Sequence, residues 1–113
     1  MVVDDAQDAI TVQDLEGRTL AWNPGAARLY GWSEAEALQL NVRERIPQAL
    51  REAALTTLAQ LSRAEMLESY LTQRLSKHGA IVDVWITSTA VIDGAGRMYA
   101  IATTERARGG EHT

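Results

Sequence analysis

The chain has 113 residues, 46% of them hydrophobic and 23% charged, and it contains no cysteine. This composition predicts one globular domain, and it excludes a disulfide scaffold, a zinc–thiolate site, an iron–sulfur cluster and a cysteine nucleophile. The formal net charge of −4 argues against nucleic acid as a partner. No apolar run reaches the roughly 20 residues of a membrane span, and the acidic N-terminus is unlike a signal peptide, so we expect no membrane span in this chain and a cytoplasmic location.

The first elements are expected to form a β-hairpin. An acidic N-terminal segment at 1–8 precedes residues 9–13, which are rich in β-branched side chains and predict a strand. The letters DLEG then predict a turn that ends at Gly17, and RTLAW at 18–22 predicts the second strand.

A strand-to-helix corner comes next. Asn23 predicts the start of a helix over 24–30, because its side chain can accept a bond from an unpaired backbone N–H, and Pro24 has no N–H to leave unpaired. Gly31 predicts the end of this helix, and the letters SEAE that follow have the form of a capping box. We interpret the aromatic side chains here as structural, packing the helices against the sheet; they are Trp22, Tyr30 and Trp32.

Residues 47–61 predict a longer amphipathic helix, since apolar side chains recur at helical spacing. Its apolar stripe comprises Ile46, Leu50, Ala54, Leu58 and Leu61. Residues 65–75 leave two alternatives open. Leucines spaced by four favour a helix, whereas the alternative is a strand with Tyr70, Thr72 and Arg74 on one face.

Residues 81–93 give the clearest strand signal, because β-branched residues are dense and two kinds of side chain alternate. We expect one face to point toward the core, and that face holds Val82, Val84, Ile86, Ser88 and Ala90. The letters DGAG at 93–96 predict a hairpin turn, and RMYAIATTE returns as the last strand. The polar tail at 107–113 is expected to be flexible.

The elements run β-β-α-α-α-β-β-β, which predicts an α+β fold with a single antiparallel sheet of about five strands and helices covering one face. The order and its turns resemble a PAS domain over residues 9–106. The likeness rests on DLEGRTLAWNPGAARLYGWSEAEAL, similar to the family's turn, strand, helix and aromatic-Gly-aromatic-Ser pattern, and on RLSKHGAIVDVWITSTAVIDGAGRMYAIATTER, similar to its closing strands. The second stretch most resembles PAS segments found beside histidine-kinase or chemotaxis-type modules.

Several positions depart from the family's pattern. Ala102, Thr103 and Thr104 stand where many relatives have Asp-Ile-Thr, so the Asp associated with coupling to a following helix is missing. His78 stands where relatives usually have Asp in the turn, and Leu71 occupies the usual acidic position on the preceding strand.

The resemblance implies cofactors whose required residues can be looked for in this chain. A cysteinyl-flavin photosensor needs a cysteine, and a family haem needs a histidine on the long helix; the chain offers neither. We interpret His78 and His112 as solvated surface residues and expect no metal site. A non-covalent flavin or a small metabolite remains compatible with the sequence.

A ligand pocket is expected between the long helix and the sheet. Ser88 brings a hydroxyl into this apolar interior, and a buried hydroxyl needs a ligand, a water or the backbone as its partner. The alternative is a satisfied serine in a filled core. The candidate pocket residues are Leu50, Ala54, Leu58, Tyr70, Val84, Ile86 and Ser88.

Two further sets of residues carry hypotheses. Trp85, Thr87 and Thr89 are expected on the outer sheet face as an interface for a homodimer, unless the N-terminal segment covers them. The candidates nearest the exit of a signal are Thr103, Thr104 and Glu105.

The sequence thus predicts a PAS sensory and interaction module of a bacterial signal-transduction protein, not an enzyme. It would bind a small ligand or a partner and relay a conformational change to a kinase or chemotaxis-type effector domain of the parent protein. The alternatives are a dimerisation module without a ligand and a small cone-shaped isomerase or hydratase, for which Tyr70 is the candidate acid or base.

Overall fold

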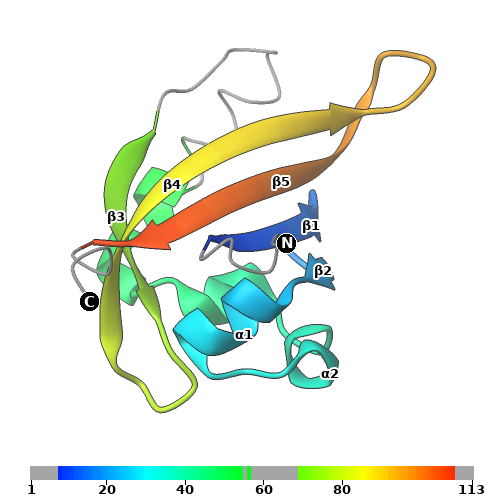
Figure 1. Cartoon of the computed structure of the whole chain (residues 1–113). Helices are drawn as coiled ribbons and strands as arrows, with labels where there is room; N and C mark the ends of the chain where they lie inside the picture. Colours follow the sequence, from blue (N-terminus) through cyan, green and yellow to red (C-terminus); the bar gives the residue numbers. More distant parts are fainter. Residues whose placement is uncertain (1–7, 55, 57–68, 109–113) are drawn as a thin grey trace.

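The computed structural model describes residues 8–54, 56 and 69–108. Five strands form one antiparallel sheet in the order β2-β1-β5-β4-β3 (Figure 1). The strands are β1 Ala9–Asp14, β2 Thr19–Trp22, β3 Tyr70–Leu75, β4 Ile81–Ile92 and β5 Met98–Ala107. The helices are α1 Pro24–Tyr30 and α2 Glu34–Ala37, and the 3₁₀ helices are η2 Val42–Arg45 and η3 Gln48–Leu50. The predicted fold class is confirmed.

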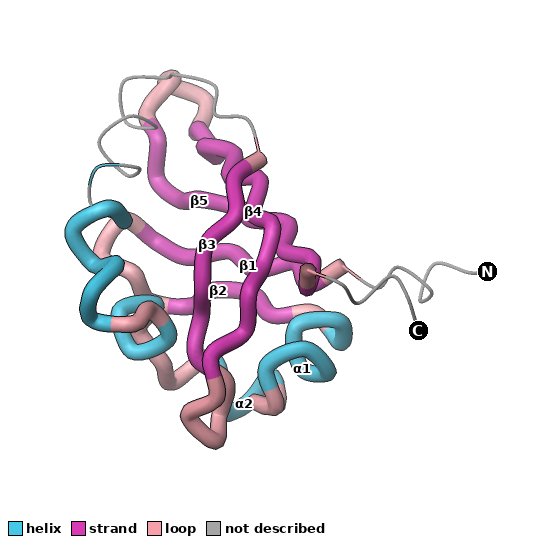
Figure 2. The backbone as a smooth tube through the Cα atoms, turned by 90° about the vertical axis from the view of Figure 1, so that its left-hand side faces the viewer, coloured by secondary structure: helices cyan, strands magenta, loops and turns pink. Residues whose placement is uncertain are grey.

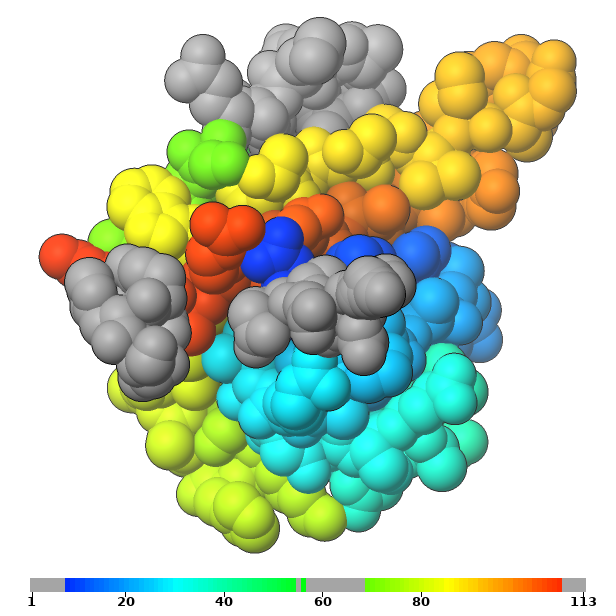
Figure 3. All heavy atoms as spheres, viewed as in Figure 1, coloured from blue at the N-terminus to red at the C-terminus, as the bar shows by residue number. Residues whose placement is uncertain are grey.

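The order of the strands places the two ends of the fold side by side at the centre of the sheet. β1 pairs with β5 in a register that sets Ala9 opposite Glu105 and Thr11 opposite Thr103. The sheet twists strongly, so that β3 crosses the direction of β1 and β2 in Figure 2. The far end of the β4–β5 hairpin projects from the body of the molecule (Figure 3), and Ile92 there is exposed.

The predicted strand-to-helix corner is confirmed in detail. Asn23 Oδ1 accepts hydrogen bonds from Ala26 N at 2.8 Å and from Ile10 N at 2.9 Å, so one amide both caps α1 and ties it to β1. Gly31 ends the helix with φ of 89°, the left-handed conformation that favours glycine. Ser33 and Glu36 form the capping box of α2.

A close approach of backbone to backbone holds α1 against the sheet. A Cβ atom at Gly25 would lie 2.3 Å from the carbonyl oxygen of Asp8. Glycine is therefore required at the start of α1, because any side chain would push the helix away from the residues that lead into β1.

The open alternative for residues 65–75 is decided in favour of a strand where the structure describes them. β3 covers Tyr70–Leu75 and pairs with β4 in a register that sets Leu71 opposite Trp85. Pairing with a neighbouring strand thus outweighs the helix propensity of these leucine-rich residues. Residues 65–68 lie outside the described part of the chain.

The predicted long helix is only partly described. It opens as η3 after Pro47 and continues as helix over residues 51–54. Leu58 and Leu61 of the predicted stripe lie outside the described residues.

The core lies between the inner face of the sheet and the α1 corner. Its buried members are Ala9, Trp22, Ala26, Tyr30, Ala37, Val84 and Ile86. Along β4 the predicted alternation is confirmed, because Val84, Ile86 and Ser88 are buried while Trp85, Thr87 and Thr89 are exposed. None of the helices described here is long and apolar enough to span a bilayer.

Candidate functional site

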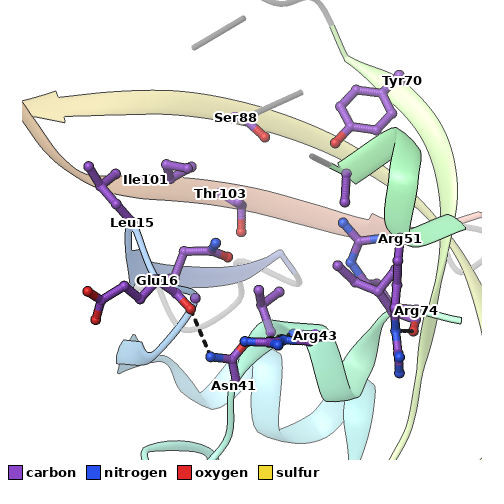
Figure 4. Close-up of a pocket in the computed structure, with 15 residues that line it drawn as sticks. Leu15, Glu16, Asn41, Arg43, Arg51, Tyr70, Arg74, Ser88, Ile101 and Thr103 are labelled. Carbon is purple, nitrogen blue, oxygen red and sulfur yellow. Dashed lines mark hydrogen bonds between the residues drawn. The ribbon is translucent and has the colours of Figure 1, made fainter. Parts of the chain in front are cut away.

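A cavity of about 450 Å³ opens on the inner face of the sheet, beside the core (Figure 4). Strands β1, β3, β4 and β5 form one side, and the chain from η2 to residue 54 forms the other. Its apolar wall consists of Leu15, Val42, Ile46, Ala54 and Ile101. The other lining residues are Gln13, Glu16, Gly17, Asn41, Arg43, Arg51, Tyr70, Arg74, Ser88 and Thr103.

The structure brings together only part of the predicted pocket. Ala54, Tyr70 and Ser88 line the cavity. Val84 and Ile86 instead belong to the packed core with α1 and do not line this cavity. The lining residues also do not include the part-buried Leu50. Leu58 lies outside the described residues.

Three hydroxyl-bearing residues line up across the sheet beneath the cavity. The register sets Thr11 of β1 opposite Thr103 of β5, and Thr103 opposite Ser88 of β4. Tyr70 contributes a fourth hydroxyl from β3, and in Figure 4 it points into the same space as Ser88 and Thr103. Within the described residues, the hydroxyls of Tyr70 and Ser88 make no hydrogen bond.

A buried polar chain connects the cavity wall to α1. Thr103 Oγ1 donates to Glu105 Oε2 at 2.6 Å, and the Tyr30 hydroxyl donates to Glu105 Oε1. The Thr11 and Thr103 hydroxyls lie 2.7 Å apart, and because the single proton of Thr103 goes to Glu105, Thr11 must be the donor there. The polar chain therefore links β1, β5 and α1 through one carboxylate.

The Tyr30 phenol is held in its protonated form. Burial raises its pKa far above the ordinary value, and the neighbouring Glu105 carboxylate raises it further, against the smaller opposite effect of Arg45 and Arg74. At neutral pH the phenol is thus a fixed hydrogen-bond donor to Glu105, and it does not act as a proton acceptor.

Two arginines are buried near this polar chain. The Arg45 guanidinium is 2% exposed and lies 5.0 Å from the ring centre of Trp22 and 5.3 Å from that of Tyr30, which are cation–π contacts. The Arg74 side chain is 8% exposed, and its Nη1 donates to Gln73 O at 2.8 Å. Arg45 Nε, Arg45 Nη1 and Arg74 Nε have no partner among the described residues.

The charges of this buried region do not balance. Glu105 is the one buried carboxylate among the described residues, against two buried guanidinium groups. No described ion pair joins Glu105 to Arg45 or to Arg74. Because buried charges are normally paired, this surplus of positive charge and unpartnered N–H groups distinguishes the region from an ordinary core.

Sequence reasoning missed both arginines and the burial of Glu105. Arg74 could have been found, because the strand alternative places it on the same face as Tyr70. Glu105 lies two residues after Thr103 on β5, so the period of a strand places both side chains on one face and could have indicated that Glu105 is buried. Arg45 lies in a 3₁₀ turn without a regular period, and no pattern marks it as buried.

The remaining predicted residues are placed as follows. Thr103 and Glu105, predicted at the signal exit, are buried on the inner face, and Thr104 is exposed on the outer face. Trp85 is 46% exposed, next to Leu71 at 39%, and Ile10 at 44% lies on the same face. The N-terminal segment proposed as an alternative cover lies outside the described residues at positions 1–7.

No group of metal-ligating side chains occurs in the part of the chain that the structure describes. His78 is exposed in the turn between β3 and β4 and does not line the cavity. The cavity wall contains no histidine, so it offers no imidazole to a haem iron among the residues that form it here.

A model of the PAS fold matches residues 2–106. The chain belongs to the PAS family. Comparison with curated proteins gave no significant match. PAS domains are sensory modules rather than enzymes, which is consistent with the predicted signalling role.

Solved PAS structures share the fold of this chain. A PAS domain from Colwellia psychrerythraea is 23% identical with a TM-score of 0.85, over 93% of this chain and 89% of that one. A domain of a sensory box sensor histidine kinase/response regulator from Geobacter sulfurreducens is 23% identical with a TM-score of 0.72, over 89% and 83%. A LOV protein from Rhodobacter sphaeroides is 17% identical with a TM-score of 0.75, over 90% and 60%.

Proposed function

We propose that this chain is the sensory and interaction module of a bacterial signal-transduction protein, and that it binds a small ligand in the cavity. The strongest support is the cavity of about 450 Å³, whose wall carries one buried donor, Arg74 Nε, without a partner among the described residues, and the hydroxyls of Tyr70 and Ser88. Its volume falls in the range of small-molecule sites. A ligand that accepts from these donors stabilises the folded, liganded state, because unpartnered buried donors cost free energy.

The proposed relay begins at Thr103, which belongs both to the cavity wall and to the buried polar chain. A ligand that moves the Thr103 side chain changes the position of Glu105 and hence the hydrogen bond to Tyr30 of α1. A ligand that binds one of two such arrangements better shifts the population toward it. The signal then leaves through β5, with Thr103, Thr104 and Glu105 nearest the exit, and through α1.

This role involves no catalysis. Tyr70 lines the cavity, where an isomerase or hydratase would need an acid or base. Among the described lining residues, however, the single carboxylate is Glu16, whose Oε1 is 2.9 Å from Arg18 Nη2. Acid–base catalysis by Tyr70 would therefore have no carboxylate partner in the cavity other than this exposed, ion-paired one.

The parent protein is proposed to be cytoplasmic and to carry a kinase or chemotaxis-type effector domain. The similar domain from a Geobacter sulfurreducens sensor histidine kinase/response regulator supports this arrangement by analogy. In this proposal residues 9–106 are the sensory domain, 1–8 an acidic segment and 107–113 a flexible tail.

The direct test of ligand binding is mass spectrometry of freshly purified protein, native and then denaturing, together with an absorption spectrum. An excess native mass that is lost on denaturation supports a bound ligand, and a visible band would identify it as a flavin or haem rather than a colourless metabolite. The protein should be purified rapidly in a small volume, so that a bound ligand is not lost by dilution. A native mass equal to that of the chain alone then counts against the sensory role.

A second candidate function, a dimerisation module without a ligand, is favoured by the outer sheet face. We define the outer-face strip as Ile10, Leu71 and Trp85, all at least 39% exposed, and with it Thr87 and Thr89. Exposed apolar side chains on a sheet face are typical of protein–protein contacts. We propose a homodimer through this strip, in either candidate function.

Sedimentation of the Trp85→Glu variant tests the homodimer. A charged side chain at the centre of the strip should shift the protein toward the monomer. The matched control is Ile92→Glu on the same strand, because Ile92 is also exposed, at 59%, but lies on the projecting hairpin. Equal sedimentation of wild type and Trp85→Glu would exclude the strip as the dimer interface.

A further inference from the structure

We propose that the ligand of the cavity is an organic carboxylate, an acidic group on an apolar body, whose carboxylate is bound by Arg74. This inference rests on the proposed function, because it names the chemical class of the ligand for the same cavity. Its basis is the combination of a buried, incompletely bonded guanidinium with a largely apolar wall.

Arg74 lines the cavity from β3 and is 8% exposed, so its charge faces the cavity and the protein interior rather than bulk water. One of its nitrogens is bound to Gln73 O, and its buried Nε has no partner among the described residues. A guanidinium presents its N–H groups in a planar fork that matches a carboxylate. The Arg74 guanidinium can therefore still form a charge-assisted hydrogen bond with a carboxylate.

The charged residues around the cavity favour an anion over a cation or a neutral ligand. Arg43, Arg51 and Arg74 line it, against the single carboxylate of Glu16. The Glu16 carboxylate is 76% exposed and its Oε1 lies 2.9 Å from Arg18 Nη2, so its charge is screened by water and partly balanced by Arg18. Arg45 adds a second buried positive charge behind the wall, where η2 packs on β3.

The rest of the wall favours a carboxylate on an apolar body over an inorganic phosphate. Ile46 and Ile101 are buried lining residues, and Val42 and Ala54 are partly buried beside them. A doubly charged phosphate would lose much of its hydration next to this wall and would find one buried guanidinium there. An apolar body gains free energy from the same contact.

The hydroxyls give the expected orientation of the ligand. Tyr70 and Arg74 lie on one face of β3, and the register places Ser88 of β4 beyond Tyr70, on the side away from Arg74. The carboxylate is expected at Arg74, with Tyr70 as a second donor, and the apolar body is expected along Ile46 and toward Ile101. In this position the ligand lies against Thr103, the first residue of the buried polar chain.

The test is an NMR titration of the full chain with three probes of matched size or charge: hexanoate, hexanamide and inorganic phosphate. Backbone amides of the cavity strands and the Arg74 Nε–H report binding. We expect hexanoate to bind at least about tenfold more tightly than hexanamide and than phosphate, because a charge-assisted hydrogen bond is worth more than a neutral one. An amide or phosphate that binds as well as hexanoate overturns the inference.

A pair of variants locates the site. Arg74→Gln should weaken hexanoate binding by about tenfold or more, and Arg74→Lys should recover part of the loss, because it restores the charge without the fork. The control is Arg97→Gln, which removes the same charge from the exposed β4–β5 turn. Hexanoate binding that is equal in Arg74→Gln and wild type overturns the assignment; the comparison of probes on wild type holds even if Arg74→Gln fails to fold.

Native mass spectrometry separates failure of the inference from failure of the proposed function. A co-purified ligand that extraction identifies as neutral or cationic leaves the sensory role standing and overturns the carboxylate. A carboxylic acid in the extract supports both. No bound mass together with no response to any of the three probes overturns both.

Discussion

The α1 corner and the cavity wall share the inner face of the sheet, yet their polar groups are bonded to different degrees. At the corner, Asn23 satisfies two backbone N–H groups, and the Tyr30 hydroxyl has Glu105 as its partner. At the cavity, the hydroxyls of Ser88 and Tyr70 make no hydrogen bond to another described residue, and the buried Arg74 Nε has no partner among the described residues either. Completed bonds hold the corner in place, whereas the donors of the wall that lack partners are the basis of the ligand site that we propose.

The largest expected effect is a loss of stability when the packing of α1 at the corner is disrupted. Gly25→Ala should lower the free energy of unfolding by about 3 kcal/mol, because the new Cβ would meet the Asp8 backbone. Urea unfolding measures the change. The control Gly94→Ala adds the same atom in a turn where nothing lies within 4 Å, and it should be nearly neutral. Equal stability of the two variants would contradict the close packing of α1.

Next in size is the loss of the Tyr30 hydroxyl. Tyr30→Phe should cost about 2 kcal/mol, because it removes a donor from a buried carboxylate while keeping the ring. Tyr99→Phe, on a residue that is 51% exposed, is the control and should cost little. If thermal or urea unfolding gives both variants the same stability, the Tyr30–Glu105 bond is not a significant support.

The raised pKa of Tyr30 predicts an alkaline weakening of the fold. The unfolded chain ionises this phenol from its ordinary pKa of 10.0 upward, whereas burial and then Glu105 keep the folded form protonated. The stability contribution is therefore complete below pH about 10, and above it the free energy of unfolding falls by up to about 1.4 kcal/mol per pH unit. Urea unfolding between about pH 9 and 11 measures the slope. Tyr30→Phe should show a shallower slope than wild type, and equal slopes would contradict the assignment.

The smallest effect is expected at the cavity. Ser88→Ala, without ligand, should change the stability by less than about 0.5 kcal/mol, because the hydroxyl has no hydrogen-bond partner to lose among the described residues. Its register neighbour Thr103 supplies the matched contrast: Thr103→Val removes two hydrogen bonds of the buried polar chain and should cost about 2 kcal/mol. A Ser88→Ala loss as large as that of Thr103→Val would show that the cavity wall is bonded like the corner.

Local signals made the corner predictable from the sequence. Caps act over three or four residues, so Asn23, Gly31 and Ser33 could be assigned with no knowledge of the fold. β3 could not be decided in this way, because the register against β4 settles its structure and that partner is distant in sequence. The alternation of β4 predicted its two faces correctly because a strand has a period of two.

The cavity was only half predictable. Ser88, Tyr70 and Ala54 were found from periodicity, but the same logic placed Val84 and Ile86 there, since alternation tells which face a residue occupies and not which layer covers it. The buried arginines were missed because arginine is ordinarily exposed. Their burial depends on the tertiary packing of η2 and β3, which no local pattern encodes.

The central claim is that a ligand in the cavity acts on α1 through Thr103, Glu105 and Tyr30. The most direct test is an NMR titration with hexanoate that compares the amides of α1 in wild type and in Thr103→Val. We predict that cavity amides respond in both proteins, and that Tyr30 and its neighbours in α1 respond in wild type alone. An α1 response of the same size in Thr103→Val, or a wild type in which the cavity responds and α1 does not, would contradict the account.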